Sequence, residues 1–335
     1  MNKDTARLAA LCLAVAIGVS SAPHAAADPG GPPITQAVFF GDSLTDAGTY
    51  GFRFTTNPGK TWAQHVADGL AQPDTPNEHV ARYDDVYQGI PGLPGPGGLN
   101  YAQGGARAGL PYSVVSDNPE GTPISAQTQL ARYLSQHGGF RPDQLVTLWI
   151  GTNDVALKFD PRFGKDLADG LRADRPATPQ QLDVDRARVR QAASAEAALA
   201  STMLAHGAQR VVVFELFDLG VLPWFDTAAA RDYVNDLTAA YNSALRAELP
   251  DDPRIQTLDM NAFVTDVLTN LDRYGFTHGA NEDACAQAGQ DYCAADSLKQ
   301  ADADRTYVFA ASEHFTTHAH ELLADYVRRE VGLRG

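Results

Sequence analysis

The sequence predicts an α/β protein built on a mostly parallel central sheet. Short apolar runs, which are typical of buried strands, alternate along the chain with longer segments whose apolar residues recur at helical spacing. Regular alternation of strand and helix indicates a layered fold with helices packed on the sheet. The predicted strands cover residues 37–40, 144–150, 210–216 and 254–260, and the predicted helices cover 59–70, 125–137, 183–205, 227–249 and a final segment that begins near 316.

The amino-terminal segment predicts export. Lys3 and Arg7 precede an apolar run, and small residues lead up to Ala27, which is the layout of a cleaved signal peptide. We expect residues 1–27 to be removed near Ala27 and residues 28–335 to form a single domain in the periplasm or outside the cell. The sequence after this segment contains no stretch apolar enough to predict a membrane span.

The charge balance excludes one class of partner. The chain has 26 basic and 41 acidic residues, and its formal net charge is −15. A strongly acidic protein repels nucleic acid and anionic membrane surfaces, so neither is expected as a main partner.

The first predicted strand ends at Gly41-Asp42-Ser43, where a reactive hydroxyl would be presented. A turn at Gly41 would expose Ser43, and the start of a following helix would direct backbone N–H groups toward negative charge beside it. Ser43 is therefore the candidate nucleophile. The alternative is that Asp42 and Ser43 only cap the next helix. The Gly-x-Ser-x-Gly elbow does not fit, because Thr45 holds the place of its second glycine.

Three stretches follow Ser43 along the chain. Helix 59–70 should bury Trp62 in the core, and residues 88–98 contain too much proline and glycine for regular structure. An extended piece at 100–106 then reaches Gly104 and Gly105, which would permit positive φ or a close approach by a ligand. An ordinary tight turn is the alternative.

The second strand also ends in polar residues, at 151–154, where Asn153 is the notable side chain. Ligands bind at the carboxyl ends of parallel strands, so this cluster and Ser43 should share an edge. Residues 155–180 are charged and predict a surface excursion. In the helix at 183–205, the predicted buried face contains Ala192, Ala195, Leu199 and Met203.

The last informative stretch contains His314, which the sequence predicts to lie in the loop before the final helix. That helix should be capped near Thr316. The imidazole could reach Ser43 from this loop. His314 and His318 lack the intervening glutamate of a His-Glu-x-x-His zinc site, so no metal and no other cofactor is expected.

Two cysteines, Cys285 and Cys293, remain after removal of the signal peptide. A close pair in an exported protein most simply forms a disulfide, worth about 2–3 kcal/mol for a short loop. Two free thiols are the alternative, and zinc would need more ligands than this pair supplies.

The segments at 41–44, 100–106, 151–154 and around His314 together resemble the GDSL, or SGNH, family of esterases and lipases, in its larger secreted bacterial branch. They occur in the family's order and span most of the chain. The resemblance implies a three-layer α/β/α, flavodoxin-like fold and no cofactor. It also implies that Ser43 is the nucleophile, that His314 is the base, and that the oxyanion hole contains the Ser43 and Gly105 N–H groups and the Asn153 amide.

The chain departs from the family in its last segment. The family pattern is Asp-x-x-His-Pro, whereas Ala311 and Phe315 hold the positions of the acid and the proline. A Ser-His dyad is therefore expected, with Glu313 as a possible relocated acid and a backbone carbonyl as a possible substitute. The predicted activity is hydrolysis of lipid or small-molecule esters by an esterase, lipase or phospholipase, or acyl transfer. The alternative is a weak or inactive relative that binds an acyl or glycan ligand.

Overall fold

In the described residues, the central sheet contains four strands, and all of its pairings are parallel. The computed structural model describes residues 32–80, 89–109, 118–156, 178–287 and 290–333. The strand order is β1-β4-β5-β6, with β1 at Gln36–Gly41, β4 at Gln144–Trp149, β5 at Val211–Phe214 and β6 at Ile255–Leu258. These strands confirm the predicted α/β fold, and their carboxyl ends lie at one edge of the sheet.

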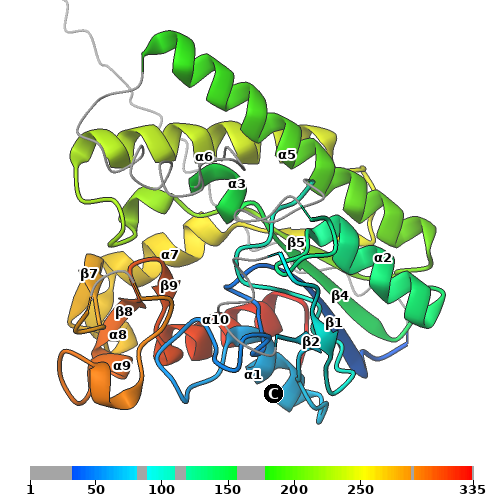
Figure 1. Ribbon diagram of the computed structural model, residues 1–335, viewed down its shortest axis with the longest axis horizontal. Coiled ribbons are helices and arrows are strands. Elements are labelled where there is room, and N and C mark those ends of the chain that lie inside the picture. Colours follow the sequence, from blue (N-terminus) through cyan, green and yellow to red (C-terminus); the bar gives the residue numbers. More distant parts are fainter. Residues whose placement is uncertain (1–31, 81–88, 110–117, 157–177, 288–289, 334–335) are drawn as a thin grey trace, which may run out of the picture.

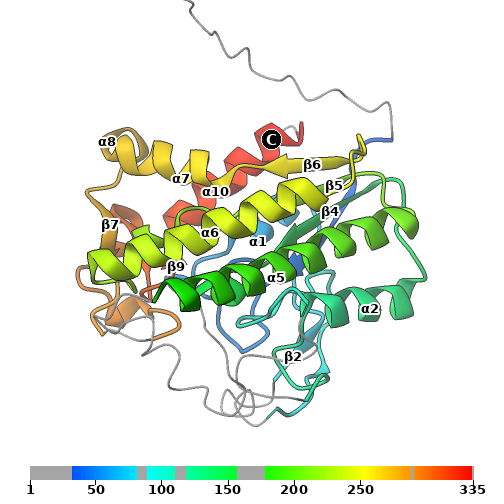
Figure 2. The ribbon, with the colours of Figure 1, turned by 90° about the horizontal axis from the view of Figure 1, so that it is seen from above.

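Helices cover both faces of the sheet. Helices α2, α5 and α6 lie on one side, and α1 and α10 lie on the other (Figures 1 and 2). Their bounds are Trp62–Gly69 for α1, Ala126–His137 for α2, Pro179–Ala205 for α5, Ala228–Glu248 for α6 and Thr317–Glu330 for α10. Thr316 caps α10, as predicted, because its hydroxyl accepts a hydrogen bond from the Ala319 N–H.

Aromatic side chains fill the core between β1, β4 and α1. Trp62 is fully buried, as predicted, and its ring centroid lies 4.9 Å from that of Phe214. The Trp149 ring is stacked on the same phenylalanine at 5.0 Å and lies 6.1 Å from the Trp62 ring. The start of α1 is thereby fixed against the sheet.

The buried face of α5 differs in part from the prediction. Leu199 and Met203 are buried, but Ala192 and Ala195 are only half-buried, and Glu196 is fully buried in their place. In a helix that contains many alanines, the positions of the alanines do not show which face is buried. The buried glutamate could not be predicted, because the apolar pattern assigns polar residues to the exposed face.

A side-chain amide and a short extended segment complete the hydrogen bonding along the outer edge of β1. The Gln72 amide accepts from the Ala37 N–H at 2.7 Å and donates to the Ala37 carbonyl at 2.9 Å. Beside it, residues 99–101 form two backbone hydrogen bonds with Phe39, at 2.8 and 2.9 Å. Residues 99–101 therefore lie directly along β1.

A second, smaller sheet carries His314. It contains β7 at His278–Asp283, β8 at Tyr307–Ala310 and β9 at His314–Phe315. The prediction that His314 lies in a loop is therefore wrong: it pairs antiparallel with Ala310 of β8. A strand of two residues is too short to produce a sequence pattern.

The remaining elements are short or follow the central strands. They are α3 at Thr152–Ala156, α7 at Met260–Thr269, α8 at Leu271–Tyr274, α9 at Ala303–Thr306, β2 at Glu78–His79, β3 at Leu93–Pro94 and the 3₁₀ turns η2 at Leu219–Val221 and η3 at Ala295–Ser297. The stretch at 88–98, predicted to lack regular structure, thus contributes two residues to a strand. Pro94 is tolerated there because the two-stranded sheet consists only of edges.

Two predictions fall outside the described residues. The signal peptide at 1–27 lies outside them entirely, and so does most of the predicted surface excursion at 155–180. None of the helices in the described ranges combines the length and apolar character needed to cross a bilayer.

Candidate functional site

The turn after β1 is held close to β4. A Cβ at Gly41 would lie 2.3 Å from the Trp149 carbonyl oxygen, so only glycine allows this approach of the two strands. The Asp42 carbonyl then accepts the N–H groups of Thr45 and Asp46, both at 3.1 Å. Ser43 lies inside this tight turn and is buried.

Two buried glutamines support the turn, and the sequence pattern did not indicate either of them. The Gln129 amide accepts from the Gly41 N–H at 3.0 Å and donates to the Gly41 carbonyl at 2.9 Å. The Gln103 N–H donates to the same carbonyl at 3.2 Å, and its side chain accepts from the Ile124 N–H at 2.9 Å. These bonds connect β1 to the segment that contains Gly104 and Gly105.

The two glycines have different structural roles. Gly105 has a φ of +84°, which favours glycine. A Cβ at Gly104 would lie 2.1 Å from the Phe54 ring, so this glycine permits close packing. The Gly104 N–H donates to Asp46 at 2.9 Å, and its carbonyl accepts from the Tyr50 hydroxyl at 2.7 Å. The sequence predicted positive φ or close approach by a ligand; positive φ occurs at Gly105, whereas the group that closely approaches Gly104 is the Phe54 ring.

The polar cluster after β4 is bonded to the same segment. The Asn153 side chain donates to the Ala106 carbonyl at 2.9 Å, and the Asp154 carboxylate accepts from the Ala108 N–H at 2.9 Å. Asn153 is half-buried, whereas Asp154 is buried. The segments that contain Ser43, Gly105 and Asn153 therefore meet at one edge of the sheet.

Buried acids lie beneath this edge. Burial raises the pKa of Asp42 to about 7, and the nearby Asp154 carboxylate adds to that rise. Burial also raises the pKa of Asp154, although Arg107 opposes the shift. Behind them, burial raises the pKa of Glu196 well above its usual value. The Tyr241 hydroxyl donates to Glu196 at 2.6 Å.

His314 joins the site through Phe54. Its ring centroid lies 5.0 Å from that of Phe54, the same ring that packs on Gly104. His314 is buried, and burial lowers its pKa to about 3, opposed by a hydrogen bond with the Asp291 backbone. An imidazole with so low a pKa is neutral at ordinary pH.

A second buried histidine, His320, supports the same region and was not predicted. Its Nδ1 accepts from the Trp62 N–H at 3.2 Å. Burial lowers its pKa to about 3, and a hydrogen bond with the Phe54 backbone opposes that shift. His320 therefore fixes the start of α1 and the Phe54 segment together.

Comparison with known proteins identifies the family. The family model for GDSL-like lipases and acylhydrolases matches residues 38–327. The chain belongs to this family. The predicted family resemblance is therefore confirmed.

One curated relative of this GDSL hydrolase is a phosphatidylcholine-sterol acyltransferase from Aeromonas hydrophila. The two chains are 25% identical over 261 residues, which cover 76% of this chain. The match spans 66% of the relative, slightly less than two thirds of its length.

Solved structures of esterases are also similar to it. Axe2, an acetylxylan esterase from Geobacillus stearothermophilus, has 16% identity and a TM-score of 0.40, with 89% of this chain and 94% of Axe2 covered. Est24, a carbohydrate acetylesterase from Sinorhizobium meliloti, has 14% identity and a TM-score of 0.38, with 87% and 97% covered.

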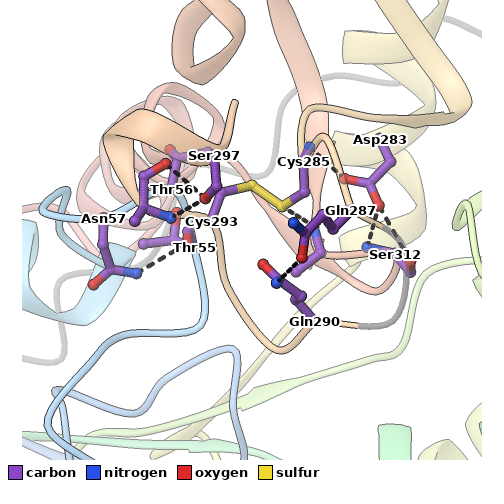
Figure 3. The surroundings of a disulfide bond; sticks show 12 residues. Thr55, Thr56, Asn57, Asp283, Cys285, Gln287, Gln290, Cys293, Ser297 and Ser312 are labelled. Atoms are coloured by element: carbon purple, nitrogen blue, oxygen red, sulfur yellow. Dashed lines mark hydrogen bonds between the residues drawn. A yellow bond between two sulfur atoms is a disulfide. The ribbon is translucent and has the colours of Figure 1, made fainter. Parts of the chain in front are cut away.

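The GDSL hydrolase contains a disulfide between Cys285 and Cys293, whose Cα atoms are 5.4 Å apart (Figure 3). Asp283 lies close to both sulfur atoms, and the three residues form a cluster of potential metal ligands within the described residues. The two sulfurs are bonded to each other and cannot act as thiolate ligands, so this cluster does not fit a metal.

The position of the family's acid is occupied by a buried alanine, Ala311. Within the described ranges, the Nδ1 of His314 is buried without a hydrogen-bond partner. Glu313 is half-buried on the same turn, and its N–H donates to the Ala311 carbonyl at 2.8 Å.

Proposed function

We propose that this GDSL hydrolase is an exported enzyme that cleaves esters through an acyl-enzyme on Ser43. One observation carries the proposal: the turn that contains Ser43 is hydrogen-bonded to the segment of Gly105, and Asn153 is bonded to that segment in turn. A serine nucleophile with several N–H donors beside it is an arrangement that acyl transfer requires.

In the proposed reaction, the Ser43 Oγ attacks the carbonyl carbon while His314 takes its proton. The electron pair of the carbonyl moves to oxygen, and the backbone N–H groups of Ser43 and Gly105 stabilise that negative charge with the Asn153 amide. The intermediate then collapses, and the bond to the alcohol oxygen breaks as His314 returns its proton to this leaving group. Water, or a second alcohol, attacks the acyl-enzyme by the same steps and releases Ser43.

Asn153 is suited to this role because its amide is fixed. One of its two N–H groups donates a hydrogen bond to the Ala106 carbonyl, and the second N–H can donate to the oxyanion. A donor that is already oriented needs no reorganisation as charge develops.

We further propose that His314 works without a side-chain carboxylate, as a Ser-His dyad. The buried alanine at 311 supports this proposal, and the hydrogen bond between His314 and the Asp291 backbone fits the expected backbone substitute for the acid. Glu313 is the alternative orienting group, and a variant is used below to separate the two.

We propose lipid esters or short acyl esters as substrates, with transfer to a second alcohol as a variant of the same chemistry. The similarity to a phosphatidylcholine-sterol acyltransferase supports testing transfer directly. Phosphatidylcholine vesicles with and without a sterol would separate the activities, because hydrolysis releases fatty acid in both samples and transfer forms a sterol ester only in the second.

The deciding experiment compares residues 28–335 with their Ser43→Ala variant on p-nitrophenyl acetate and butyrate. Ser201→Ala is a matched control, because the Ser201 hydroxyl only bonds back within α5. A fluorophosphonate should label Ser43 in the unmodified enzyme. If the unmodified enzyme and Ser43→Ala are indistinguishable and neither exceeds the rate in buffer alone, the result would instead support a protein that binds an acyl or glycan ligand without turnover.

A further inference from the structure

The turn that leads into His314 has an uncommon backbone conformation. Ala311 has a φ of 52° and Ser312 a φ of 66°, so two consecutive residues with side chains are left-handed. This region favours glycine, and other residues remain there only when their surroundings hold them. Because His314 is the first residue to pair after the turn, the turn determines the direction of its side chain.

Asp283, the last residue of β7, binds this turn (Figure 3). Its Oδ2 accepts hydrogen bonds from both the Ser312 N–H at 2.9 Å and the Ser312 hydroxyl at 3.1 Å. Its Oδ1 accepts from the Cys285 N–H at 2.8 Å. Asp283 is buried, and these bonds satisfy a carboxylate that would otherwise be costly to bury.

The disulfide loop holds the other side of the same turn. The Cys285 sulfur accepts from the Ala311 N–H at 3.0 Å. At the far end of the loop, Cys293 accepts from the Asn57 N–H at 2.7 Å and donates to the Thr55 carbonyl at 3.3 Å (Figure 3). The loop therefore links the turn before His314 to the segment whose Phe54 packs on the imidazole.

We propose that Asp283 is a positioning residue for His314: by binding Ser312 it holds the left-handed turn that directs the imidazole toward Ser43. It acts through the backbone and does not touch the reacting atoms. In this way the turn supplies the orientation that a carboxylate at position 311 supplies in the family pattern. The inference rests on the roles proposed above for Ser43 and His314.

The test uses Asp283→Asn in residues 28–335 with the disulfide intact. The new amide can still accept from Cys285, but its NH₂ group would face the Ser312 N–H, so the turn loses its acceptor. We expect kcat for p-nitrophenyl acetate to fall by about tenfold or more while KM stays within about twofold, because binding is not altered.

A second variant supplies the rescue. Ser312→Gly makes the left-handed conformation favourable without help from a carboxylate. In the double variant Asp283→Asn, Ser312→Gly, kcat should return to within about threefold of Ser312→Gly alone. Asp252→Asn is the matched control, because Asp252 also accepts from a backbone N–H, that of Arg254, in a turn outside the site.

The outcomes separate positioning from folding. Unchanged kcat in Asp283→Asn would overturn the proposal. So would a fall in kcat that Ser312→Gly does not rescue, because Asp283 would then support the fold and not the turn. A thermal melt of each variant shows whether the protein is folded.

A readout without catalysis separates this inference from the proposed function. The His314 and Phe54 rings are close enough for nuclear Overhauser effects between them. These should weaken in Asp283→Asn and return in the double variant, even if Ser43 proves unreactive toward esters and fluorophosphonates. Unchanged ring contacts in Asp283→Asn would count against positioning.

Discussion

The Phe54 ring packs against both the His314 imidazole and the backbone of Gly104. The ring centroids of Phe54 and His314 are 5.0 Å apart, and a Cβ at Gly104 would lie 2.1 Å from the phenyl ring. One aromatic side chain therefore sets the spacing between the imidazole and the segment that contains Gly105.

Gly104→Ala tests this spacing. The added methyl group must displace the Phe54 ring, which should shift His314 and lower kcat by about tenfold or more. Steady-state kinetics on p-nitrophenyl acetate measure the effect. Gly279→Ala is a suitable control, because the nearest atoms to its Cβ would be the flexible ends of two leucine side chains, the nearest at 3.2 Å. Equal kcat values for the two variants would contradict the spacing role.

Asn153→Ala tests the oxyanion hole. Loss of one preorganised donor should lower kcat by about 100-fold or more and should change KM far less. Asn270→Ala, which removes an exposed amide at the end of α7, should leave both constants unchanged. A change confined to KM would assign Asn153 to substrate binding instead.

The stability of the fold should fall as pH rises from 6.5 to 8. Burial raises the pKa values of Asp42, Asp46 and Asp74 to about 7, 6 and 8, so the folded state binds these protons more tightly than the unfolded state does. Their stabilisation is complete below the unfolded value near 4 and is lost as pH rises through the folded values.

The buried histidines have the opposite dependence. Burial lowers the pKa of His314 and His320 to about 3, so their contribution is lost as pH falls from about 6.5 toward 3. Above pH 6.5 only the buried acids contribute to the pH dependence of stability, so the Tm should fall by several degrees between pH 6.5 and pH 8. Calorimetry of Ser43→Ala, with and without Asp42→Asn, measures this. A Tm that rises over this interval would refute the prediction.

Ala311→Asp tests the missing acid. A carboxylate three residues before His314 could orient the ring and favour its charged form, so kcat should increase and the pKa of His314 should rise. Aspartate also tolerates the left-handed conformation at 311 better than most residues do. Glu313→Gln is the opposing variant. Loss of activity in Glu313→Gln, with no gain in Ala311→Asp, would show that Glu313 is the acid and that the dyad assignment is wrong.

The cysteine pair predicts a simple mass result. Alkylation of residues 28–335 without reductant should add no label, whereas alkylation after reduction should add one label to each of Cys285 and Cys293. Reduction should also lower kcat, because the loop holds both the turn before His314 and the segment at 55–57. Two labels without reductant would exclude the bond.

The parts of the site that follow long strands could be predicted from sequence. Ser43 and Asn153 each follow a buried run, and parallel pairing places both at one edge of the sheet. Gly104 and Gly105 were predictable because glycine pairs mark special backbone. These signals are local and repeat along the chain.

The supporting residues could not be predicted, because their roles depend on contacts between distant segments. Gln129 and Asp283 look like ordinary surface residues in the sequence, yet both are buried and bind backbone groups of the site. The second sheet was missed for the same reason: His314 occupies a strand of two residues, which is defined only by its partner β8.

The hydrogen bonding along the outer edge of β1 affects whether copies of this protein can associate by strand pairing. Gln72 and Gln129 each bond to both backbone groups of one strand residue, and residues 99–101 bond to the residue between. An unpaired strand edge is a template onto which another polypeptide can add. Here the donors and acceptors of β1 that face outward are already occupied. The edge strand next to the nucleophile is thereby protected from intermolecular strand addition, and this protection depends on the correct placement of two amide side chains, Gln129 buried and Gln72 half-buried.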